Sequence, residues 1–237
     1  YLSGSDLIRY KELHPKKSAN LIAFARGGWG AARLLESSQP WRKGLLLGFS
    51  DVSSILLSRL SAGFYGGIHG PLLTTLGDEP DWSKERLKNL LFGEEVPDLQ
   101  GTILKKGISY GHLIATNLTI ATHLIGTNHF PNLKGCNLIL EDIGEDPYRI
   151  DRMLTQWRLA GELQKVGGIG LGSFKDCELA KDSETHKTFK LKEILKDRLS
   201  DLNIPIIADL PVGHINGNAA LPIGHASKLD GNKGLLS

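Results

Sequence analysis

A serine–aspartate pair stands between a short apolar run at residues 44–48 and an apolar pattern of helical spacing that ends near residue 60. This order predicts a buried strand that turns sharply into a helix, with Ser50 at the corner. There a hydroxyl lies at the sheet edge, where free N–H groups of the first helical turn point toward the group it attacks. The corner resembles a nucleophile elbow, although the pattern Gly-x-Ser-x-Gly has a glycine where this chain has Val52. An ordinary helix N-cap formed by Ser50 or Asp51 is the alternative.

A serine nucleophile needs a base, and the base needs a carboxylate that holds it in one tautomer. Several carboxylates follow the apolar run at residues 137–140. Glu141 lies nearest that predicted strand, so we expect it to be half-buried and able to stabilise a charged histidine. We expect Asp142 and Glu145 to be solvated turn residues.

Eight histidines are available as the base. His214 follows a glycine after the apolar strand predicted at residues 205–208, which places it well to reach over a cleft. His69 and His225 lie in similar turns and are its rivals. Because the chain has no His-Glu-x-x-His or Cys/His pattern, we expect no zinc site at the other candidates, His112, His123 and His129.

The glycine-rich turn at residues 26–30 follows another predicted strand, at residues 20–25. The turn lacks the lysine and the serine or threonine of a phosphate-binding P-loop, and it lacks the full spacing of a dinucleotide fingerprint. Since it should lie beside Ser50 at the same sheet edge, its backbone is placed to supply an N–H to an oxyanion. A turn that only needs positive φ at its glycines is the alternative.

Two strand–turn–helix units in succession, at residues 20–36 and 44–60, predict a parallel α/β sheet with both glycine-bearing turns at its carboxyl edge. From residue 78 a charged segment with prolines predicts a connector. We therefore divide the chain into an N-terminal α/β domain (1–77), a connector (78–100) and a smaller β-rich domain (101–237). Further helices are expected at residues 6–13, 84–92, 117–125 and 148–163, and further strands at residues 102–104, 137–140, 168–174 and 205–208.

The 237 residues can bury a full core, and 41% hydrophobic with 23% charged residues is the composition of an ordinary globular protein. A net charge of +2 without a basic stripe argues against nucleic acid as a partner. No apolar run approaches the roughly 20 residues of a membrane span, so we expect no membrane partner. The two cysteines, Cys136 and Cys177, match no metal spacing and permit a reducing compartment.

Five stretches taken in order resemble the LD-carboxypeptidase family of serine peptidases, which also includes the microcin C immunity peptidases. The resemblance covers nearly the whole chain. The matching stretches are the glycine turn with its helix (25–35), the serine corner (48–52), His-Gly-Pro (69–71), Leu-Glu-Asp-Ile-Gly-Glu-Asp-Pro with its helix (140–154), and Gly-His (213–214) with Leu-Pro-Ile-Gly (221–224).

The resemblance implies a Ser–Glu–His triad of Ser50, Glu141 and His214, with an oxyanion hole made by the N–H groups of Asp51 and Gly28. It implies a nucleophile-elbow domain joined to a smaller β-rich domain that supplies the glutamate and the histidine. The implied reaction is hydrolysis of the L,D-peptide bond before a C-terminal D-alanine in murein tetrapeptides, during peptidoglycan recycling in the cytoplasm. The reaction needs no metal and no organic cofactor, and the implied assembly is a homodimer.

Two other functions stay open. A peptidyl-nucleotide of the microcin C type would need an aromatic platform, for which Trp29 is the candidate. A catalytically inactive homologue would only hold cell-wall peptides. A carboxypeptidase must also bind a free carboxylate, for which an arginine fork is the usual device. Arg33 and Arg149 are the candidates, with ordinary helix-surface charges as the alternative.

The chain differs from the family pattern in two places. Ala-Thr-Asn-Leu at residues 115–118 stands where the family usually has Gly-Gly-Asn-Leu, which predicts a different loop shape or substrate fit. Relatives also carry a strand–helix–strand opening before the position of Tyr1, so we expect part of the first sheet to be missing.

Overall fold

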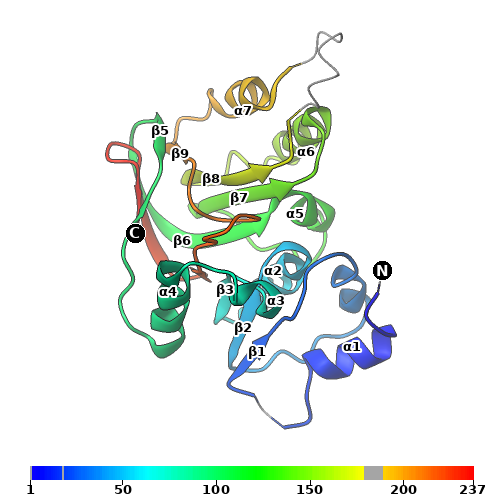
Figure 1. The fold of residues 1–237 in the computed structure, drawn as a ribbon. Helices are drawn as coiled ribbons and strands as arrows, with labels where there is room; N and C mark the ends of the chain where they lie inside the picture. The colour runs from blue at the N-terminus through cyan, green and yellow to red at the C-terminus, as the bar shows by residue number, and fades with distance from the viewer. Residues whose placement is uncertain (1, 18, 179–188) are drawn as a thin grey trace.

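Alternating helices and strands make up the computed structural model, which describes residues 2–17, 19–178 and 189–237. The α/β class predicted from the two strand–turn–helix units is confirmed (Figure 1). The helices are α1 (Asp6–Leu13), η1 (Ala32–Glu36), η2 (Ser50–Val52), α2 (Ser53–Ser61), α3 (Leu73–Leu76), α4 (Asp81–Phe92), α5 (Leu118–Leu124), α6 (Pro147–Leu159) and α7 (Leu191–Leu199). The strands are β1 (Leu21–Ala23), β2 (Leu45–Gly48), β3 (Gly67–His69), β4 (Leu99–Gln100), β5 (Thr102–Lys105), β6 (Ile108–Asn117), β7 (Asn137–Ile143), β8 (Gly168–Lys175), β9 (Ile206–Ala208), β10 (Leu221–Ile223), β11 (Ala226–Asp230) and β12 (Leu235–Leu236).

The strands form two sheets. The first has the order β1-β2-β3-β10, in which the first three strands are parallel and β10 runs antiparallel to β3. The second has the order β4-β12-β11-β6-β7-β8-β9-β5. Its central strands, from β6 to β9, are parallel, and antiparallel strands flank them on both sides. The first sheet therefore takes its last strand from the far end of the chain.

The carboxyl edges of the two sheets meet beside helices α2 and α5, which pack against each other (Figure 1). The N–H of Asn117, at the end of β6, donates to the hydroxyl of Ser53, at the start of α2, over 3.3 Å. Apolar side chains from both sides of this junction, including Leu56 and Leu118, belong to one core cluster. The residues that follow the parallel strands of both sheets are thus brought together.

The structure corrects the predicted elements in several places. Strand β7 continues to Ile143, so Glu141 lies within the strand and not after it. The helix expected at residues 31–36 is the 3₁₀ helix η1. The longest strand, β6, and helix α7 had no counterpart among the predicted elements. The division at residues 78–100 stays a prediction. No helix within the described ranges is both long and apolar enough to cross a bilayer.

Candidate active site

The backbone at Ser50 has φ of 62°, one of three positive values at non-glycine residues in the described ranges. Such a left-handed conformation costs free energy for a residue with a Cβ, and it is a known feature of functional corners. Neither Ser50 nor Asp51 caps the helix that follows, so the N-cap alternative is wrong. Val52, at the position of the second glycine of the hydrolase pattern, is buried in the core.

Three side chains from distant parts of the chain form a hydrogen-bonded series at this corner, which we call the Ser–His–Glu trio: Ser50, His214 and Glu141. The His214 Nε2 atom lies 3.1 Å from the Ser50 hydroxyl oxygen. Its Nδ1 atom lies 2.7 Å from Oε2 of Glu141. Since a carboxylate oxygen accepts, Nδ1 carries the proton and Nε2 of a neutral ring is free to accept one from the serine.

Burial and local shape fix the orientation of His214. The Glu141 side chain is fully buried, whereas the His214 side chain is 17% exposed and Ser50 is partly exposed. The ring of Phe49 packs on the imidazole with 4.7 Å between centroids. The loop between β9 and β10, which carries His214, is called the histidine loop. A Cβ at Gly213 would lie 2.6 Å from Oε2 of Glu141, so only glycine lets this loop approach the carboxylate so closely. The buried glutamate therefore holds the histidine in place, and solvent reaches the trio at Ser50.

The electrostatics of Glu141 follow from its position in β7. Burial raises the pKa of its carboxyl group, and the hydrogen bond and the charge of His214 oppose that shift. The pairing with β8 is also irregular here, because Glu141 alone lies opposite two residues of β8 between the pairs Leu140–Leu171 and Asp142–Phe174, which is a β-bulge in β8. Bulges often redirect a side chain near functional sites. Among the described residues, Glu141 is the acidic side chain that pairs with His214.

The glycine turn lies against Ser50, as the strand order predicted. A Cβ at Gly27 would come within 2.9 Å of both the Cβ and the hydroxyl oxygen of Ser50. Gly28 has φ of 115°, and a Cβ there would meet nothing within 4 Å. The Asp51 carboxylate reaches across and accepts from the N–H of Ala31 over 2.8 Å. Burial raises the pKa of Asp51, and bonds from the turn oppose the shift. The N–H groups of Asp51 and Gly28 stay predictions as oxyanion donors.

The three candidate substrate-binding residues lie apart from the trio's hydrogen bonds. Trp29 is 44% exposed, and its ring meets His123 edge-on at 5.7 Å. Arg33 forms an ion pair with Asp6 at 2.8 Å. Arg149 pairs with two acidic neighbours at the start of α6, Glu145 at 3.5 Å and Asp146 at 3.6 Å. Both arginines are thus engaged by carboxylates of this chain, and their predicted role in binding a substrate carboxylate stays untested.

The rival histidines have other surroundings. His69 is completely buried, neither of its ring nitrogens has a hydrogen-bond partner among the described residues, and burial lowers its pKa to about 3. Its ring also contacts Phe49, with 5.7 Å between ring centroids. His225 is exposed. Among the described residues, no group of three or more His, Cys, Asp or Glu side chains is placed to hold a metal ion.

Asp142 was expected to be solvated, and that expectation is wrong. The residue is 2% exposed, because β7 continues past it and α5 covers it. Sequence analysis missed its part in the site. The signal that could have revealed it is the Asn-Leu pair at the start of α5, since a capping asparagine there places free N–H groups beside the end of the neighbouring strand.

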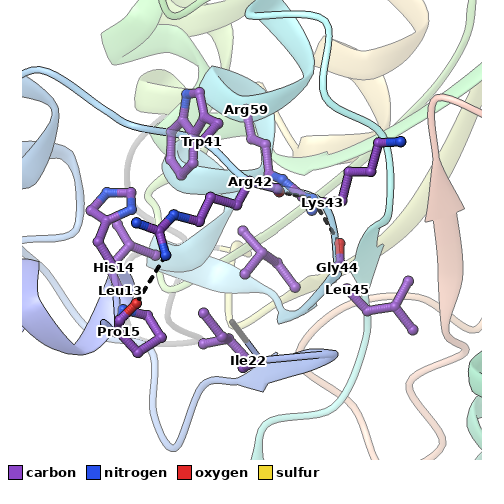
Figure 2. A pocket seen from close by; sticks show the side chains of 12 residues that line it. Leu13, His14, Pro15, Ile22, Trp41, Arg42, Lys43, Gly44, Leu45 and Arg59 are labelled. Carbon is purple, nitrogen blue, oxygen red and sulfur yellow. Dashed lines mark hydrogen bonds between the residues drawn. The ribbon is translucent and has the colours of Figure 1, made fainter. Parts of the chain in front are cut away.

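Two hollows lie outside the trio. A small pocket at the amino ends of β1 and β2 is lined by Trp41, Arg42 and Arg59, and the two arginines donate to backbone carbonyls there (Figure 2). A cavity of about 930 Å³ lies between α7 and β5, bordered by Pro211 and Ile215 of the histidine loop. Neither is lined by a residue of the trio.

Comparison with known proteins gives the same family that the motifs resemble. The model of the LD-carboxypeptidase C-terminal domain matches residues 110–229. A protein of Synechocystis sp. that carries a provisional carboxypeptidase name is 47% identical over all of this chain and 79% of its own length. The murein tetrapeptide carboxypeptidase of Pseudomonas aeruginosa is 32% identical over 98% of this chain and 80% of its own.

Solved structures with a similar fold are also found. The crystal structure of muramoyltetrapeptide carboxypeptidase from Oxalobacter formigenes superposes with a TM-score of 0.86 and 26% identity, covering 99% of this chain and 84% of that one. MccF in complex with glutamyl sulfamoyl guanosine has a TM-score of 0.81 over 100% of this chain and 81% of its own, and at 20% identity it shows the fold alone. These matches define the class as peptidases of α/β fold. Within that class, the chain belongs to the LD-carboxypeptidase family.

Proposed function

We propose that the protein is a serine carboxypeptidase that hydrolyses the L,D-peptide bond before a C-terminal D-alanine in murein tetrapeptides. The observation that carries the proposal is the unbroken series of hydrogen bonds from Ser50 through His214 to buried Glu141. The names of the Pseudomonas and Oxalobacter relatives support the substrate class. By the same resemblance we propose a cytoplasmic homodimer that acts in peptidoglycan recycling.

In the proposed mechanism the peptide carbonyl next to D-alanine lies over Ser50. His214 Nε2 takes the hydroxyl proton as the oxygen attacks, and Glu141 stabilises the imidazolium that forms. The N–H groups of Asp51 and Gly28 donate to the tetrahedral oxyanion. His214 then gives its proton to the leaving amine of D-alanine. Water, activated by the same nitrogen, releases the shortened peptide and restores the serine.

Cleavage of a peptidyl-nucleotide is the second candidate. The half-exposed indole of Trp29, which belongs to the glycine turn and lies beside His123, supports it as a surface on which a base could stack. The likeness to MccF bears on the fold only. A third candidate, an inactive homologue that binds cell-wall peptides, is disfavoured because the trio is intact.

The candidates are separated by offering the protein two substrates. L-Ala-γ-D-Glu-meso-diaminopimelate-D-Ala reports D-alanine release, and aspartyl sulfamoyl adenosine reports aspartate release. We expect a higher kcat/KM for the tetrapeptide and no effect of Trp29→Ala on it. Preferential cleavage of the adenosine compound, lost in Trp29→Ala, would contradict the proposal in favour of the second candidate. Binding of the tetrapeptide without cleavage would favour the third.

A further inference from the structure

Asp142, the neighbour of Glu141 in β7, is a second buried carboxylate that the proposed mechanism does not use. Successive side chains of a strand point to opposite faces of a sheet. Glu141 accordingly faces the histidine loop, whereas Asp142 faces the start of α5. Asp142 is 2% exposed and forms no ion pair among the described residues, so hydrogen bonds must compensate its burial.

Four hydrogen bonds reach this carboxylate, and every partner is a donor. Oδ2 accepts from the N–H of Thr119 over 2.9 Å and from its hydroxyl over 2.8 Å. Oδ1 accepts from the side-chain amide of Asn117 over 3.0 Å and from the N–H of Ile143 over 2.9 Å. A carboxylate accepts all four, whereas an amide at this position would direct its own donors at backbone N–H groups.

The same partners connect Asp142 to Glu141. Asn117 is the register partner of Glu141 in the parallel pairing of β6 with β7, and its side chain also caps α5 by accepting from Ile120 N–H over 3.0 Å. Asp142 thus ties the end of β7, directly after Glu141, to the end of β6 and the start of α5. Because the extra residue of β8 interrupts the regular pairing opposite Glu141, these bonds help to fix this end of β7.

We propose that Asp142 is a positioning residue for Glu141: it fixes the end of β7 against α5 and so aims the Glu141 carboxylate at His214. The inference rests on the proposed function, because its kinetic consequence passes through the Ser–His–Glu trio. Asp142 itself touches none of the reacting atoms.

Asp142→Asn tests this in a double-mutant cycle with Glu141→Gln. We expect Asp142→Asn alone to lower kcat for D-alanine release by about 10- to 100-fold, with KM unchanged, because small misplacements of a working group are costly. In the Glu141→Gln background the same change should lower kcat less than about two-fold, since a residue that acts through Glu141 has nothing left to position. Equal effects in both backgrounds would overturn the proposal.

Two further variants serve as a matched control and as a milder change to the same contacts. Asp201→Asn makes the same change at an exposed carboxylate that pairs with Arg158, and it should leave kcat unchanged. Thr119→Val removes one of the four bonds and guards against misfolding of Asp142→Asn. It should lower kcat a few-fold in the parent protein and not at all in the Glu141→Gln background. A loss in both backgrounds would contradict the proposal.

A substrate-free readout separates this inference from the proposed function. The proton between His214 Nδ1 and Glu141 should give a far-downfield ¹H NMR signal in ¹⁵N-histidine-labelled protein. We expect the signal to broaden or shift in Asp142→Asn and to stay in place in Asp201→Asn. If the two variants respond in this way but the parent protein releases no D-alanine, the substrate proposal fails and the positioning role stands. An unaltered signal in Asp142→Asn would overturn the positioning role whatever the substrate.

Discussion

Gly27 lies so close to Ser50 that a Cβ at position 27 would come within 2.9 Å of the serine hydroxyl oxygen. The glycine turn and the serine corner are therefore in direct contact, although 22 residues of chain separate them in the sequence. A side chain at residue 27 would have to push aside the hydroxyl, the backbone of the corner, or the turn itself.

Gly27→Ala should therefore impair turnover more than folding. We expect kcat to fall by about 10- to 100-fold because the hydroxyl is displaced from Nε2 of His214. The unfolding midpoint should change little. Gly77→Ala is the matched control, since its added Cβ meets nothing within 4 Å and its φ is −62°. Steady-state kinetics and thermal unfolding of both variants check this, and full activity of Gly27→Ala would show that the contact is unimportant.

The Asp51 side chain should act on the glycine turn and not on its own helix. Its carboxylate accepts from the N–H of Ala31, which anchors the turn beside Ser50. Asp51→Ala removes the acceptor and should lower kcat about ten-fold or more. Asp51→Asn keeps one carbonyl oxygen for the Ala31 N–H and should recover most of the loss. The idea fails if Asn and Ala lower kcat equally, as measured at saturating tetrapeptide.

His69 should make stability depend on pH. Its folded-state pKa of about 3 lies below the ordinary value of 6.5, because its ring is buried without a partner. The unfolded chain therefore binds the extra proton first, and the free energy of unfolding falls as pH drops from about 6.5 toward 3, by up to about 1.4 kcal/mol per pH unit.

Replacing this histidine with an apolar residue should flatten that dependence. Urea unfolding of His69→Leu between pH 7 and pH 4 should lose this part of the slope, whereas His225→Leu, at an exposed site, should keep it. A slope that is the same in His69→Leu and in the parent protein would mean that His69 takes up its proton in the folded state as well.

The parts of the site that follow apolar runs could be predicted from the sequence. Ser50 comes two residues after a buried strand, and His214 follows a glycine five residues beyond another apolar strand, so local patterns place both at a sheet edge. Their meeting could not be derived from pattern alone. It depends on two sheets sharing an edge and on β10 returning to the first sheet, contacts between segments about 150 residues apart.

Asp142 shows why the remaining part was missed. Polar residues after an apolar run usually mark the end of a strand, but a sheet that is covered on both faces can bury polar side chains within a strand when each one finds partners. Two of the four hydrogen bonds to Asp142 come from Thr119 in the first turn of α5, 23 residues earlier in the chain. Strand β6 was not predicted for a similar reason, because Ser109, Gly111 and His112 interrupt its apolar pattern.

The most direct test of the central claim is D-alanine release from L-Ala-γ-D-Glu-meso-diaminopimelate-D-Ala by the parent protein and by Ser50→Ala. Ser37→Ala, at an exposed position outside the trio, is the control. We predict release by the parent and by Ser37→Ala, and a loss of several orders of magnitude in Ser50→Ala with the fold intact by circular dichroism. Undiminished release by Ser50→Ala would contradict the serine mechanism, and no release by the folded parent protein would contradict the proposed substrate.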